Sequence, residues 1–481
     1  MPSDGSSFRR SVLQGFLWLG TGTFIGQFIS WFSTIFVIRL LEPSDYGLMA
    51  MAAVFISLIA MISELGVSAA LIQAKELTAR QIQQISTWVL ITGLIGFAVC
   101  YASGPWVAQF YRESDLVSMI RVLGLNMILM TSYAVPQSLF IREMNFKIKT
   151  QIELAAQLGA TMLTLLLALR GIGVWALIVG QIAMHLIKSI AFNVLCSHKL
   201  VPLLDLRGSG RLLHYGLTLT GDRLMNFVYA ESDKIIVGKV LGITSLGSYA
   251  VAMNLASIPM EKVMPIVSQI SFAAYSRIQD DLERIRTNVI GTTRAVAFVS
   301  FPVFFGMSAV APLAVPLILG EQWEPLVVPF QLLSLVLPLK ALGTILPSAV
   351  FAVGRPAVNL VNMVIASAMM ASAFMLGVQG GVIGICAAWL VAYPVVFGIT
   401  TIRSLRTLGL SFRSYLVEVR FPFLAGAVML ILVEVLGRVI VMSQPVYSLI
   451  LVIGFGLVCY ISLVQIFKKE QYAEIRSLLQ L

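Results

Sequence analysis

The chain has 481 residues and a mean hydropathy of +0.91; 58% of its residues are hydrophobic and only 12% are charged. A soluble domain carries about 25% charged residues, so this composition excludes a soluble enzyme, a disordered chain and a disulfide-stapled secreted domain. The sequence therefore predicts an integral membrane protein. Its net charge of +10 is interpreted first as a signal for membrane orientation and second as a sign of anionic partners.

Largely apolar runs of about 20 residues, the length that crosses a bilayer as a helix, recur along the whole chain. They do not alternate with the period of two that a membrane β-barrel requires. The expected protein is all-α, with fourteen transmembrane helices at residues 12–38, 46–71, 83–107, 116–141, 148–169, 174–195, 212–238, 246–270, 289–318, 326–352, 357–376, 382–402, 415–436 and 446–467.

The Lys and Arg residues are unevenly distributed over the two ends of these spans. With the N-terminus placed in the cytoplasm, 22 of the 33 belong to the cytoplasmic side, 5 to the opposite side and 6 to the spans. Positive charge is retained on the cytoplasmic side of a membrane. We therefore expect an even number of spans, with both termini in the cytoplasm.

The sequence repeats itself at an offset of 200 residues, where "IRLLEPSDYGLMAMA" aligns with "GKVLGITSLGSYAVA". We expect two six-helix bundles related by a pseudo-twofold axis around a central cavity, followed by two extra helices. Such repeated halves are typical of transporters that bind their substrate between the halves, although a duplicated channel or structural protein is an alternative. The expected domains are residues 1–197, 198–411 and 412–481.

Four segments carry a resemblance to a known group: "FIGQFISWFSTIFVIRLLEPSDYGLMAMAAVF", "ELGVSAALIQ", "LGSYAVAMNLASIP" and "LGEQWEPLVVPFQLL". Over residues 10–467 the chain resembles the polysaccharide transporter family of the MOP flippase superfamily, and within it the Wzx-type exopolysaccharide flippases. The resemblance implies a MATE/MOP-like fold. It also implies a flippase for undecaprenyl-diphosphate-linked oligosaccharide in the bacterial inner membrane, which works by alternating access and couples to H⁺ or Na⁺ without a cofactor.

The same resemblance implies that the chain is not an enzyme. Its expected partners are the lipid-linked oligosaccharide, membrane lipids, a polysaccharide polymerase and a chain-length regulator, with no nucleic acid. One alternative is a MATE-like cation or drug antiporter. Another is a membrane-embedded polysaccharide-modifying enzyme, which the short outer loops of about ten residues disfavour. The four cysteines are scattered singly, so no metal site is expected.

Charges inside spans are the candidate site residues, because each costs several kcal/mol unless it faces protein or water. The span 212–238 is the richest in them. Arg223 and Lys234 lie about 20° apart around its axis, with Asn226 and Asp233 to one side. The substrate-binding candidates are Arg223, Lys234, Lys262, Lys340, Arg121 and Asn226, and the ion-coupling candidates are Glu64, Asp233 and Glu261.

Structural explanations compete with these roles. Neighbouring charges could neutralise each other, as in Asp233 with Lys234 or Glu261 with Lys262. Arg121 and Lys340 either contact the glycan or lock helices together. Glu64 could instead form a structural hydrogen bond or reach cytoplasmic water.

The charge distribution generates a test of topology. Reporter fusions after residues 200 and 475 should both report a cytoplasmic location, and a fusion near residue 322 should report a periplasmic one. A periplasmic C-terminus would contradict the arrangement of fourteen spans.

Overall fold

The computed structural model describes residues 33–64, 71, 78–196, 203, 210–439 and 445–467, with the backbone alone for Glu64 and 210–223. Within these ranges the chain is almost entirely helical and forms no strand. Eleven helical segments of the described residues are long and apolar enough to cross a membrane. The chain is a multi-pass membrane protein, as its composition predicts.

Two of these segments are more than twice as long as a single crossing requires. Leu224–Arg277 has 54 residues and Pro356–Leu408 has 53, whereas about 20 residues suffice for one span. Each therefore covers two of the expected spans. The expected first span, 12–38, lies mostly outside the described residues, of which 33–40 are helical. The count of fourteen helices thus stays a prediction.

The chain divides into two compact units. Unit 1 consists of Met1–Phe227 with Gly242–Thr244, and unit 2 consists of Val228–Leu241 with Ser245–Leu481. The main boundary falls within the expected seventh span. The division into domains 1–197, 198–411 and 412–481 stays a prediction.

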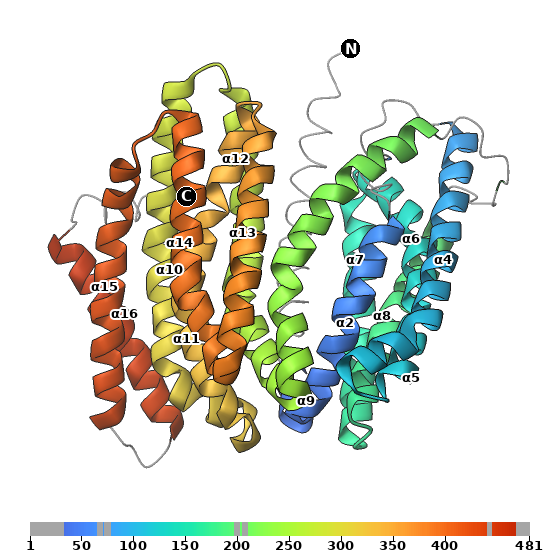
Figure 1. The fold of residues 1–481 in the computed structure, drawn as a ribbon, viewed down its shortest axis with the longest axis horizontal. Coiled ribbons are helices and arrows are strands. Elements are labelled where there is room, and N and C mark those ends of the chain that lie inside the picture. Colours follow the sequence, from blue (N-terminus) through green and yellow to red (C-terminus); the bar gives the residue numbers. More distant parts are fainter. Residues whose placement is uncertain are drawn as a thin grey trace. The chain divides into compact units, whose positions relative to one another are not determined.

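Unit 1 contains helices that pack pairwise (Figure 1). Those described in full or nearly so are α2 (Pro43–Glu64), α4 (Ala79–Tyr111), α5 (Leu116–Leu123), α6 (Leu125–Arg142), α7 (Phe146–Leu169) and α8 (Val174–Leu195). Helix α4 packs against α2 and α6, and α7 packs against α8. The carboxylate of Asp45 accepts a hydrogen bond from the Val174 amide at 2.9 Å, which places negative charge at the start of α8. A helix N-terminus favours such a charge.

Unit 2 contains the remaining helices, coloured from green to red in Figure 1. They are the later part of α9 (Gly210–Arg277), α10 (Leu282–Leu319), the 3₁₀ turn η1 (Glu321–Leu326), α11 (Val327–Gly343), α12 (Ile345–Ala352), α13 (Pro356–Gly377), the turn η2 (Val378–Gly380), α14 (Gly381–Leu408), α15 (Phe412–Val439) and α16 (Pro445–Phe467). Helix α14 packs against α13 and α11, and α10 packs against α11, α15 and α16.

Gly242 interrupts α9 with φ 81° and ψ −174°. Glycine adopts these backbone angles without the steric strain that a side chain would introduce. The interruption lies between the expected spans 212–238 and 246–270. The break in the helix thus falls in the short segment where the sequence predicts that one span ends and the next begins.

The two appended helices are joined to unit 2 by polar contacts as well as by packing. Arg294 of α10 donates to Glu418 of α15 from Nε at 2.7 Å and from Nη2 at 3.2 Å. Tyr460 of α16 donates to the carbonyl oxygen of Phe298 at 3.1 Å. A two-point arginine–carboxylate contact fixes orientation as well as distance. Helices α15 and α16 are therefore an integral part of unit 2.

Helices α13 and α14 touch each other through their backbones at a pair of glycines. A Cβ atom on Gly384 would overlap the carbonyl oxygen of Gly377 and lie 3.1 Å from its carbonyl carbon. The obstructing atoms belong to the backbone, so no side-chain rotation can relieve the overlap. Glycine is required here by close approach.

Gly384→Ala should therefore destabilise the folded protein by about 1–3 kcal/mol, the range for overpacking a tight contact. Gly398→Ala is the matched control, because a Cβ on Gly398 of the same helix would meet nothing within 4 Å. Thermal unfolding of the purified protein in detergent measures both. Equal unfolding midpoints for the two variants would show that the helices do not approach this closely.

Candidate functional site

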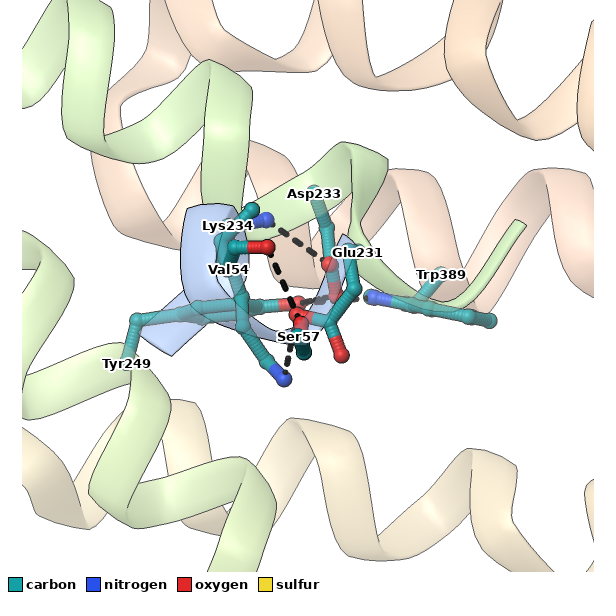
Figure 2. Close-up of polar contacts among 7 residues, drawn as sticks. All are labelled: Val54, Ser57, Glu231, Asp233, Lys234, Tyr249 and Trp389. Atoms are coloured by element: carbon teal, nitrogen blue, oxygen red, sulfur yellow. Dashed lines mark hydrogen bonds and ion pairs between the residues drawn. The ribbon is translucent and has the colours of Figure 1, made fainter. Parts of the chain in front are cut away.

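A chain of hydrogen bonds inside unit 2 joins a carboxylate to two aromatic side chains (Figure 2). The Tyr249 hydroxyl donates to Oδ2 of Asp233 at 2.6 Å and accepts from the Trp389 indole nitrogen at 2.8 Å. The three side chains come from α9 before Gly242, α9 after Gly242, and α14. All three residues are buried, with Asp233 only 1% exposed. A buried carboxylate needs such donors, because it has lost its water.

The ion pair beside this chain is not the one that adjacent charges suggest. Lys234 places its ammonium 2.8 Å from Oε2 of Glu231, one helical turn away, and both side chains are about one-fifth exposed. Oδ1 of Asp233 instead accepts a hydrogen bond from the Lys234 backbone amide at 2.7 Å. The alternative in which the side chains of Asp233 and Lys234 neutralise each other is therefore wrong. Residues three apart on a helix face one another, whereas adjacent ones do not.

Lys340 of α11 lies against the same tryptophan from another helix. Its Nζ is 4.3 Å from the centroid of the Trp389 ring, a cation–π contact. No hydrogen bond or ion pair joins this ammonium to any residue in the described ranges. The side chain is only partly buried. Its three N–H groups are thus available to a ligand.

Three further aromatic rings surround Trp389 and fix its plane. The ring centroids of Phe374, Tyr393 and Tyr229 lie 5.1, 5.7 and 6.3 Å from that of the tryptophan. Tilted and edge-on aromatic contacts at these distances are favourable. The Trp389 ring that Lys340 contacts is therefore packed against several neighbours, and the ammonium lies on it without direct contact with a carboxylate of the described residues.

The remaining candidates of α9 differ in how much is described. Glu261 and Lys262 are exposed and form no ion pair with each other or with any other described residue. Asn226 is also exposed. Arg223 lies in the helical backbone of α9, and Glu64 ends α2, but both side chains lie outside the described residues. Substrate binding by Arg223, Asn226 and Lys262 and ion coupling by Glu64 and Glu261 therefore stay predictions.

Arg121 belongs to unit 1 and stacks on an aromatic ring of the neighbouring helix. Its Cζ lies 4.5 Å from the Tyr101 ring centroid, and its Nε donates to the Tyr101 carbonyl at 3.4 Å. These contacts join α5 to α4. They support the helix-locking role that the sequence left open for Arg121.

Sequence reasoning identified Asp233, Lys234 and Lys340 but did not assign roles to Tyr249 and Trp389. One signal was present, since a tyrosine or tryptophan within an apolar span needs a partner for its polar atom. The sequence does not say which partner that is. Among the described residues, no group of three His, Cys, Asp or Glu side chains is placed to hold a metal ion.

The bridging position of Tyr249 generates a stability test. Tyr249→Phe removes one donor and one acceptor, which leaves Oδ2 of Asp233 and the indole nitrogen of Trp389 each without this hydrogen-bond partner. We expect a loss of about 1–3 kcal/mol, the cost of an unsatisfied buried polar group. Thermal unfolding measures it, with Tyr447→Phe as the control at a tyrosine that is 59% exposed. Equal effects of the two substitutions would contradict the bridging role.

Two curated relatives are similar to nearly the whole chain or to most of it. The lipopolysaccharide biosynthesis protein WzxC of Escherichia coli (strain K12) is 24% identical over 445 residues, which cover 90% of this chain and 89% of that protein. The succinoglycan biosynthesis transport protein ExoT of Rhizobium meliloti (strain 1021) is 24% identical over 303 residues, which cover 63% of this chain and 61% of that protein.

Solved structures show the fold. The lipid II flippase MurJ in its inward closed conformation superposes with a TM-score of 0.76 at 12% identity and covers 95% of this chain and 100% of that one. An inward-facing multidrug resistance MATE transporter of the MOP superfamily gives a TM-score of 0.62 at 17% identity, covering 82% and 99%. The MATE/MOP-like fold expected from the sequence is confirmed.

The family itself follows from a direct match. The model of a family described as "Polysaccharide biosynthesis protein" matches residues 36–328, which is more than half of the chain. The resemblance noted in the sequence is thereby confirmed, and the chain belongs to this polysaccharide biosynthesis protein family.

Proposed function

We propose that this chain is a flippase that moves undecaprenyl-diphosphate-linked oligosaccharide repeat units across the bacterial inner membrane by alternating access. The repeat units would serve exopolysaccharide, capsule or O-antigen biosynthesis. The proposal includes cytoplasmic termini, coupling to H⁺ or Na⁺, and delivery of the flipped repeat unit to a polysaccharide polymerase and a chain-length regulator.

Three independent kinds of similarity support this function. The family is one of polysaccharide biosynthesis, one relative is named as a biosynthetic transport protein, and one protein of the same fold is named as a lipid II flippase. Two of these names refer to polysaccharide biosynthesis and the third to a lipid flippase, and a lipid-linked oligosaccharide is the cargo that combines the two. They favour a transporter over the alternative of a polysaccharide-modifying enzyme.

The observation that carries the proposal is the state of Lys340. Its ammonium rests on an aromatic face and has no carboxylate in contact among the described residues. A diphosphate brings two or more negative charges into the membrane, and a charge-assisted hydrogen bond is about twice as strong as a neutral one. An ammonium that is positioned but not paired can supply such bonds.

The MATE-like alternative requires acidic groups that a cationic drug can reach. In unit 2 the two carboxylates beside Trp389 are already engaged, Asp233 by Tyr249 and Glu231 by Lys234. Of the described charged groups around Trp389, the Lys340 cation is the one left open, whereas Glu261, an open carboxylate elsewhere in unit 2, is a candidate for ion coupling. This distribution favours an anionic cargo over a cationic one.

The coupling ion requires a carboxylate that can exchange it. Asp233 has both oxygens occupied by donors, whereas Glu261 is exposed and has no hydrogen-bond or ion-pair partner among the described residues. Within unit 2 we therefore favour Glu261 over Asp233 as the exchanging group. Glu64 stays the candidate in unit 1.

Lys340→Gln should weaken binding of the lipid-linked diphosphate about tenfold or more, because a hydrogen bond to a charged group contributes about 1.5–3 kcal/mol. Lys340→Arg should retain much of the activity, since it keeps the charge and the cation–π contact. Transfer of a fluorescent lipid-linked oligosaccharide across proteoliposome membranes measures the effect.

The control for this experiment is Arg438→Gln, which removes an exposed cation in the last turn of the appended helix α15. It should transport at the normal rate. If Lys340→Gln also does so while folding normally, the cationic site is not used. Faster transport of a cationic dye than of the oligosaccharide would instead favour the antiporter.

A further inference from the structure

A cavity of about 880 Å³ lies at one end of unit 2. Neither Lys340 nor Trp389 is among the residues that line it. It is formed where α9 ends, α10 begins and α14 passes into α15. Polar side chains predominate in its lining, which includes Arg286, Arg294, Thr287, Asn288, Ser411 and Ser414. A cavity with both polar and apolar lining at the end of a membrane bundle can hold water, a polar ligand or a lipid headgroup.

Arg286 is positioned in this cavity by the main chain of another helix. Its Nε donates to the Leu408 carbonyl at 2.7 Å, at the C-terminal end of α14. The next residue, Gly409, has φ 67°, and a Cβ there would overlap the Arg286 guanidinium. Glycine at this position thus allows the helix to end with a positive φ and leaves space for the Arg286 side chain. The hydrogen bond from Nε fixes the guanidinium against the end of α14.

The outer part of the same guanidinium has only a weak partner. Its Nη1 lies 3.0 Å from Oε2 of Glu283, whose side chain is 79% exposed. Exposed ion pairs of this kind contribute about 0–1 kcal/mol. No hydrogen bond to a described residue engages Nη2. Since Nη2 lies against Gly409, Nη1 is the atom that a phosphate can contact, and a phosphate can replace Glu283 there at small cost.

Neutral donors lie around this arginine. Ser414 and Asn288 line the cavity, and neither has a hydrogen-bond partner among the described residues. Arg294 closes the wall but is committed to Glu418. One available guanidinium with a hydroxyl and an amide nearby matches the oxygen atoms of a single phosphodiester better than those of a more highly charged group.

The rim of the cavity is apolar on the side of α9. Ile270 lines the cavity and is 65% exposed, and Ile266, one turn earlier on the same face, is 59% exposed. Leu410 adds an apolar side chain from the α14–α15 connection. A free phosphate gains nothing from such a rim, whereas the acyl chains of a lipid can lie against it.

We propose that this cavity binds the phosphate headgroup of a membrane phospholipid, with Arg286 as the phosphate ligand and Ile266 and Ile270 against the acyl chains. The bound lipid is not the transported cargo. It is a resident molecule that connects the ends of α9, α10 and α14.

The test measures binding of short-chain dihexanoyl phosphatidylglycerol to the purified full-length protein in an uncharged detergent, by calorimetry or native mass spectrometry. Arg286→Gln should raise the dissociation constant about tenfold, as expected for the loss of a charge-assisted contact. Arg284→Gln is the matched control, because Arg284 is an exposed arginine of the same helix outside the cavity lining. It should leave the dissociation constant unchanged.

Two further variants guard against a folding defect in Arg286→Gln. Glu283→Gln removes the competing carboxylate and should tighten binding, an effect in the opposite direction that loss of structure cannot produce. Ser414→Asp places a negative charge in the cavity and should weaken binding. Equal losses in Arg286→Gln and Arg284→Gln, or weaker binding in Glu283→Gln, would overturn the site.

Inorganic phosphate is the second probe and distinguishes the source of the ligand. The lipid should bind at least tenfold more tightly than phosphate, and Ile270→Ser should reduce that advantage. If phosphate binds as tightly as the lipid, the cavity holds a free anion and the lipid proposal is wrong.

Discussion

The architecture of unit 2 depends on one hydroxyl group. Tyr249 donates to a carboxylate that has almost no contact with water, and it accepts from an indole nitrogen in another helix. Each of these three polar atoms would be costly inside the bundle without the others. Together they join the two stretches of α9 that flank Gly242 to helix α14. They also fix the tryptophan ring on which Lys340 of α11 rests.

This arrangement explains how a strongly apolar bundle can hold four charged groups in a small volume. Glu231 and Lys234 satisfy each other within one turn, and Asp233 is satisfied by a hydroxyl and a backbone amide. The cost of burying these charges is offset locally, without a bound ligand. Lys340 differs from these three residues, since the aromatic face of Trp389 stabilises its cation and leaves its N–H donors unused. Glu231, Asp233 and Lys234 are thus satisfied within the protein, whereas Lys340 is suited to binding a ligand.

The spans could be predicted from the sequence because helix length and hydropathy are local properties. The break near residue 242 was predictable for the same reason, from a short polar gap between two apolar runs. Asp233, Lys234 and Lys340 could be selected as candidates from the sequence, because a charge inside a membrane span is costly unless it faces protein or water.

Partner choice was not predictable. The alternative in which Asp233 pairs with Lys234 could be disfavoured from the sequence, because a helix turns adjacent side chains away from each other, but the actual partners could not be named. The partnership of Asp233 with Tyr249 depends on how two crossings of α9 lie beside each other, and that of Tyr249 with Trp389 depends on a helix 140 residues later in the chain. Hydropathy contains no information on such registers. The proposed function rests on the family likeness. The contacts of individual residues are consistent with that function but do not identify it.

The contact between Arg294 and Glu418 limits how readily a protein of this kind can lose its last two helices. Helices α15 and α16 follow the two halves that the sequence repeat predicts, so they look like a removable addition. Their loss would leave Arg294 without its carboxylate and would uncover the aromatic face where Phe423 packs edge-on against Phe301 and Phe305. A chain cut before α15 would therefore lose contacts on which the folding of α10 depends. Gain or loss of α15 and α16 would therefore require substitutions in α10 at the same time.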